Sequence, residues 1–94
     1  MNIFIAYTLK DGVLTVNDFI KIKNLLNGHK LFIHYFRPDI DSHPKIQKEI
    51  EKSDLLILIK TTASFESVWV RDELKIASQI NIPIYFIEIN DLRN

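Results

Sequence analysis

The chain has 94 residues, of which 47% are hydrophobic and 26% are charged, a balance typical of one small globular domain and not of a disordered segment. Its formal net charge is zero, which argues against nucleic acid or an anionic membrane as a partner, because both favour a surplus of basic residues. It contains no cysteine, which excludes disulfides and thiolate metal sites and favours a cytoplasmic location. The first residues lack the pattern of a signal peptide, and the longest apolar run, Leu55–Ile59, is too short to span a bilayer.

The first half of the chain alternates between strand and helix patterns. The apolar stretch NIFIAYT, Asn2–Thr8, predicts a buried strand. A helix is predicted for Val16–Gly28, because Phe19 and Ile22 recur at helical spacing and an Asn-Gly pair forms a C-terminal stop. The stretch KLFIHYF, Lys30–Phe36, predicts the second strand.

The second half continues this alternation. A second helix is predicted for Ser42–Ser53. The following strand, Asp54–Lys60, is almost continuously apolar, which is typical of a parallel sheet covered on both faces. We expect a third helix to begin within Ser64–Ser67 and to end near Asn81, before a fourth strand at Pro83–Ile89.

This order of elements predicts an α/β fold. We expect one domain over residues 1–94, with a flavodoxin-like parallel sheet of four strands in the order 2-1-3-4, flanked by three helices. In such sheets, ligands bind beyond the carboxyl ends of the strands, at the point where the strand order reverses. The segments expected there are Tyr7–Val13, Phe36–Ser42 and Thr61–Trp69.

One charge lies on the apolar side of the third predicted helix. When Ser67–Ala77 is wound at about 100° per residue, Glu73 falls in the same arc as Trp69 and is the only charged residue there. A carboxylate in that position is costly unless it is paired, protonated or open to a cavity. From the residues alone, Glu73 is a structural carboxylate paired with Lys10 or with Arg71 of a neighbouring subunit, a side chain extending from the edge of the arc, or a group facing a ligand.

Three stretches resemble the Toll/interleukin-1 receptor (TIR) domain family. The opening IFIAYTLKD, Ile3–Asp11, resembles the first conserved box of that family, and Ile46–Leu74 resembles its middle, where a helix leads through Ser-Asp into an apolar strand. The most specific element is Ser-x-Trp-x-x-x-Glu, which spans residues 67–73. The stretch Ile82–Ile89 resembles the next strand. TIR domains are usually longer at the C-terminal end, so we expect the fourth strand to be an exposed apolar edge that a partner subunit covers.

The resemblance implies a signalling or bacterial defence protein that cleaves nicotinamide from NAD⁺. Many TIR domains do so with a glutamate four residues past this tryptophan, a position that Glu73 occupies. NAD⁺ or a related nucleotide would be the substrate, with no cofactor and no metal. The residues expected to contact it are Tyr7, Thr8, Lys10, Phe36, Arg37, Ser64, Ser67 and Trp69. The aromatic rings among them would stack on flat groups and Arg37 would meet pyrophosphate, although Trp69 also suits core packing.

Two other functions stay open. Other TIR domains perform no chemistry and act as interaction modules by self-association, and the exposed fourth strand would then favour at least a dimer. The third hypothesis is a related nucleotide-binding or ribosyl-transferring protein that uses the same crevice at the strand ends.

Overall fold

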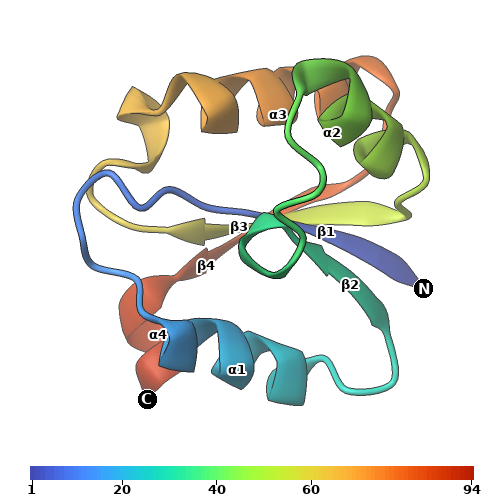
Figure 1. Ribbon diagram of the computed structural model, residues 1–94. Helices are drawn as coiled ribbons and strands as arrows, with labels where there is room; N and C mark the ends of the chain where they lie inside the picture. The colour runs from blue at the N-terminus through green and yellow to red at the C-terminus, as the bar shows by residue number, and fades with distance from the viewer.

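A sheet of four parallel strands forms the centre of the computed structural model, which describes residues 1–94 (Figure 1). The strands are β1 (Asn2–Ala6), β2 (Lys30–Ile33), β3 (Leu55–Lys60) and β4 (Ile84–Glu88). Their order is β2-β1-β3-β4 and every neighbouring pair is parallel, which confirms the predicted α/β fold and strand order.

Helices cover both faces of this sheet. They are α1 (Val16–Leu25), α2 (His43–Glu51), α3 (Val68–Gln79) and α4 (Ile89–Arg93). Figure 1 shows α2 and α3 together on one face and α1 and α4 on the other. The prediction of three helices was wrong by one, because α4 has only five residues and is too short to show a helical period. No helix in the structure has the length and apolar character that crossing a membrane requires.

Several predicted elements end earlier than expected, and these differences shape the site. The first strand stops at Ala6, and the second stops at Ile33 because His34–Phe36 form a short 3₁₀ helix. A second 3₁₀ turn, Ser64–Glu66, precedes α3. The side chain of Ser67 then caps α3 by accepting a hydrogen bond from the Val70 amide at 3.3 Å.

Alternate residues of β1 face two separate apolar clusters. Ile3 and Ile5 pack with buried residues of α1 and with Leu92 of α4, whereas Phe4 and Ala6 pack with buried residues of α2 and α3. This alternation follows from the two-residue period of a strand. Because both faces of the central strands are buried, the open positions lie at the ends and edges of the sheet.

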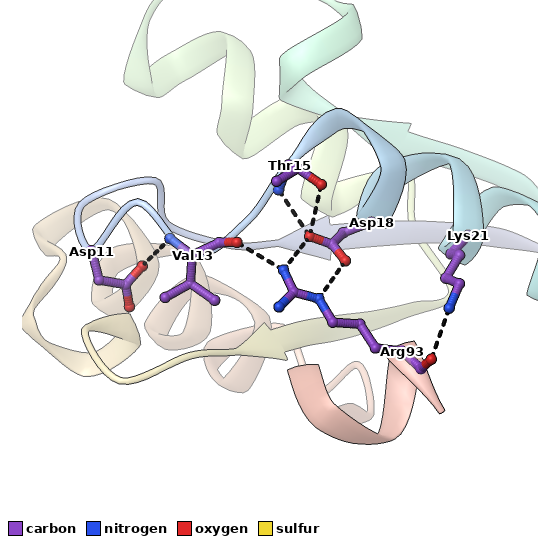
Figure 2. Close-up of polar contacts among 6 residues, drawn as sticks. All are labelled: Asp11, Val13, Thr15, Asp18, Lys21 and Arg93. Atoms are coloured by element: carbon purple, nitrogen blue, oxygen red, sulfur yellow. Dashed lines mark hydrogen bonds and ion pairs between the residues drawn. The ribbon is translucent and has the colours of Figure 1, made fainter.

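The buried carboxylate of Asp18 links α4 to α1 through hydrogen bonds. Asp18 accepts two hydrogen bonds from the guanidinium group of Arg93, at 2.9 and 2.8 Å, and another from the Thr15 amide at 2.8 Å (Figure 2). Arg93 also donates to the Val13 carbonyl at 2.8 Å, so α4 holds the loop between β1 and α1. The hydrogen bonds from Arg93 lower the pKa of Asp18 to about 2.

We expect Asp18→Asn to destabilise the protein by about 1–3 kcal/mol at neutral pH, because the substitution removes a buried charged acceptor of several hydrogen bonds, although Arg93 itself stays partly exposed. The folded pKa is below the unfolded one, so this stabilisation is present above about pH 4 and is lost as the pH falls toward 2. Urea unfolding at pH 7 and at pH 3 measures both effects. Asp91→Asn, on the exposed side of α4, is the matched control, and equal losses in both variants would contradict the prediction.

Candidate functional site

A cavity of about 340 Å³ opens at the carboxyl ends of β1 and β2, beside the start of α3. Its lining residues come from β1 and the loop after it, from the 3₁₀ helix after β2, and from α3 with its N-cap: Ile5, Tyr7, Thr8, Leu9, His34, Ser67, Trp69 and Glu73. This is the edge at which open parallel sheets bind ligands, close to the point where the strand order reverses.

Five of the nine site residues named from the sequence line this cavity. They are Tyr7, Thr8, Ser67, Trp69 and Glu73. The first two follow β1, and the other three belong to α3 or its N-cap, so residues 59 or more positions apart in the chain line one cavity. The parallel order of the strands brings them together, because the chain leaves β1 and β3 at the same edge of the sheet.

The other four residues lie outside the cavity. Lys10 is exposed on the loop after β1, and Ser64 is fully buried, where its hydroxyl accepts a hydrogen bond from the Thr61 amide at 2.8 Å. Phe36 packs edge-on against Phe19 of α1. Arg37 forms an exposed bidentate pair with Asp39 and borders a separate hollow of about 230 Å³ beside β2 and α2.

The cavity also contains His34, which the sequence analysis did not select. The predicted second strand ran through to Phe36, and this made His34 one of several side chains inside a strand. In the structure β2 ends at Ile33, so His34 is the first residue beyond its carboxyl end. The sequence did contain a signal for His34, because it is a polar residue near the carboxyl end of β2, the strand beside β1, and ligand-binding residues of parallel sheets lie at such ends.

Glu73 is the buried ionisable group of the site. Its residue is 8% exposed and lies on α3 between the buried Val70 and Ala77. Its carboxylate has no hydrogen-bond or ion-pair partner in the protein. Every side-chain oxygen that is fully buried in this protein does have a partner, so the Glu73 oxygens are not fully buried, and they reach solvent through the cavity that Glu73 lines. Burial, with a smaller contribution from the charge of Asp72, raises the pKa of Glu73 to about 8.

Two aromatic side chains border the cavity on opposite sides of the sheet. Tyr7 packs edge-on against Phe19 of α1, with ring centroids 4.7 Å apart, and its burial raises the pKa of its phenol to about 12. Trp69 is 42% exposed, so it is not a core residue. The imidazole ring of His43 stacks on the indole ring of Trp69, with centroids 4.0 Å apart and planes 8° apart, which holds the orientation of the indole beside the cavity.

Hydrogen bonds that Asp11 accepts hold two loops beside the cavity. One carboxylate oxygen accepts from the Ala63 amide at 2.8 Å, which joins the loop after β1 to the loop after β3. The other accepts from the Val13 amide at 3.3 Å (Figure 2). The hydrogen bond from Ala63 is the main reason that the pKa of Asp11 is lowered. Asp11 therefore has a structural part in the site, although it does not line the cavity.

No model of a protein family, no curated protein and no solved structure matches this chain. No group of three or more histidine, cysteine or carboxylate side chains is placed to hold a metal ion.

We expect Glu73→Gln to stabilise the protein in alkaline solution. The folded pKa of Glu73 lies above the unfolded value of 4.5, so the wild-type protein loses stability as the pH rises between these two values. Glutamine resembles the protonated side chain and does not ionise. Urea unfolding should show little difference at pH 4 and a gain of at least about 2 kcal/mol at pH 9. A gain that does not change with pH would contradict the assigned pKa.

Proposed function

We propose that the cavity binds NAD⁺ and that the chain cleaves the bond between nicotinamide and ribose, with Glu73 as the catalytic carboxylate. The observation that carries this proposal is a buried carboxylate without a protein partner, facing a cavity bordered by Trp69 and Tyr7. The resemblance of Ser67-x-Trp69-x-x-x-Glu73 to the TIR motif supports the same assignment. By that resemblance, the protein acts in signalling or bacterial defence.

The reaction requires stabilisation of positive charge more than it requires an acid. The bond between the ribose C1′ and the pyridinium nitrogen breaks, and its electron pair goes to the nitrogen, so nicotinamide leaves as a neutral molecule. Positive charge then develops on the ribose, as in glycoside hydrolysis. Water adds to C1′ and releases a proton, which gives ADP-ribose. A carboxylate beside the ribose stabilises the developing charge and accepts hydrogen bonds from the sugar hydroxyls.

The size of the cavity determines which part of NAD⁺ it holds. Its volume of about 340 Å³ is at the lower end of the range of about 300–1,000 Å³ for small-molecule sites. We therefore place the nicotinamide and its ribose inside, with Trp69 or Tyr7 against the flat ring, and the rest of the dinucleotide toward solvent. The hydroxyl groups of Thr8 and Ser67 and the imidazole of His34 are further polar groups that line the cavity.

The positive charge of the pyridinium ring of NAD⁺ would favour ionisation of Glu73. Burial disfavours the ionised carboxylate in the free protein and raises its pKa to about 8. A bound pyridinium cation favours the ionised form, because an opposite charge nearby lowers the pKa of a carboxylate. Binding would therefore produce the carboxylate in the complex that carries out the reaction.

Nicotinamide release from NAD⁺ by the purified chain tests the proposal. We expect release by the wild-type protein and a loss of at least about 100-fold in Glu73→Gln, because a group that stabilises transition-state charge typically contributes that much. Asp72→Asn is the matched control, since Asp72 is adjacent on α3 but does not line the cavity, and it should retain activity. Absence of release at every protein concentration, or equal activity in both variants, would exclude this function.

The pH dependence of cleavage tests the state of Glu73 separately. The value of kcat/KM reports groups of the free protein, so it should rise with pH and level off above about 8. The value of kcat reports the complex, and its inflection should lie at lower pH because the bound cation favours ionisation. Initial rates measured from pH 5 to 9.5 provide both profiles. An inflection in kcat/KM near the usual pKa of a glutamate would contradict the proposed environment.

A non-catalytic interaction module is the second candidate function. It is favoured by the exposed aromatic residues Tyr85 and Phe86 on β4, which NAD⁺ cleavage does not explain. A module of this kind should associate equally well in wild-type protein and in Glu73→Gln, and should release no nicotinamide. A nucleotide sensor, the third hypothesis, would bind NAD⁺ in an equilibrium binding experiment and leave it intact.

A further inference from the structure

The outer edge of β4 exposes apolar side chains that the cavity does not involve. This strand pairs only with β3, and its other edge has no neighbour. Tyr85 is 58% exposed and Phe86 is 53% exposed, and they project to opposite faces of the sheet. Phe65, from the turn before α3, packs edge-on against Phe86 with ring centroids 5.8 Å apart and is itself exposed. Both faces beside this edge therefore expose aromatic side chains.

The register of β3 with β4 determines which backbone groups face outward. The Pro83 carbonyl accepts a hydrogen bond from the Leu56 amide at 2.9 Å, so Pro83 faces β3. Because successive residues of a strand alternate in direction, Tyr85 and Ile87 also face β3. The amide and carbonyl of Phe86, at the centre of the strand, point away from the sheet and have no partner in the chain.

The opposite edge of the same sheet is different. There β2 has only four residues, begins with Lys30 and is stopped by the 3₁₀ helix at His34–Phe36, and its apolar residues Phe32 and Ile33 are buried. A short edge strand that carries a lysine is protected against pairing with another chain. The β4 edge has five residues, exposes Tyr85 and Phe86 at its centre and Glu88 at its end, and carries no lysine or arginine. This difference between the two edges predicts that another chain pairs with β4 and not with β2.

We propose that β4 pairs antiparallel with β4 of a second copy of this chain, centred on Phe86, to form a continuous eight-stranded sheet. In this register Phe86 lies opposite Phe86 of the second copy, and the two residues exchange their free amide and carbonyl hydrogen bonds. Tyr85 lies opposite Ile87 of the second copy, an aromatic and β-branched pair that stabilises antiparallel strands.

The occupant is a second copy because the edge is complementary to itself. Around Phe86, the two-fold axis pairs aromatic with aromatic, and aromatic with branched aliphatic, on the two faces. The only charged residue of the strand, Glu88, already pairs with Lys60 of its own chain at 3.2 Å, and the net charge of zero avoids repulsion between copies. This inference does not depend on catalysis, since the edge strand contributes no residue to the cavity.

The absence of cysteine allows a clean test of the register. Directly opposed residues of this type have Cα atoms about 5.5 Å apart, within the disulfide range, whereas two copies of residue 85 lie on a diagonal of about 7–8 Å. Under a mild oxidant that accepts the two electrons, Phe86→Cys should form a disulfide-linked dimer at least about ten times faster than Tyr85→Cys, the matched control on the same strand. Light scattering should give the wild-type protein twice its chain mass of 11.0 kDa.

The second test introduces a charge at the centre of the two paired β4 strands. Phe86→Lys should weaken the dimer by about tenfold or more, because like charges directly opposite each other destabilise paired strands. A wild-type monomer at all concentrations would overturn the proposal. A dimer that links equally well through residue 85, or that is insensitive to Phe86→Lys, would also overturn it by placing the interface elsewhere. Capture of a strand from a different protein by a monomeric chain would do the same.

Discussion

The parallel pairing of all four strands is the constraint on which the rest of the structure depends. Parallel strands cannot be joined by hairpins, so each is followed by a crossover, and the loops after the strands collect at one edge of the sheet. The cavity lies there because the chain leaves β1 and β2 and enters α3 within the same region. The carboxylates of Asp11 and Asp18 then hold these loops by accepting backbone and guanidinium hydrogen bonds.

Three carboxylates near this edge show how their partners determine their role. Asp11 and Asp18 accept hydrogen bonds from backbone amides or from Arg93, and their pKa values are lowered. Glu73 is buried like Asp18 but accepts no hydrogen bond, and its pKa is raised. The first two stabilise the fold in their ionised form. The third destabilises it when ionised, which is a cost that proteins retain most often at functional sites.

The site and the β4 edge are separate consequences of how the helices cover the sheet. The two pairs of helices bury β1 and β3 on both faces, so the apolar residues of the central strands lie in the two clusters. At the carboxyl ends this cover is incomplete, which leaves the cavity beside Glu73. At the β4 side it is also incomplete, which leaves Tyr85 and Phe86 exposed. One arrangement of layers therefore produces both the cavity at the carboxyl ends and an unpaired edge strand.

The order of strands and helices followed from the sequence alone, because hydrophobic periodicity and the stop signals of Gly28 and Pro83 are local properties. The unusual place of Glu73 also followed from helical spacing. The sequence did not predict α4, the early end of β2, or the presence of His34 in the cavity, because these depend on contacts such as Arg93 with Asp18, 75 residues apart. Only the tertiary structure decided that Trp69 faces the cavity while Arg37 lies outside it, since neighbouring strands and helices determine where each side chain points.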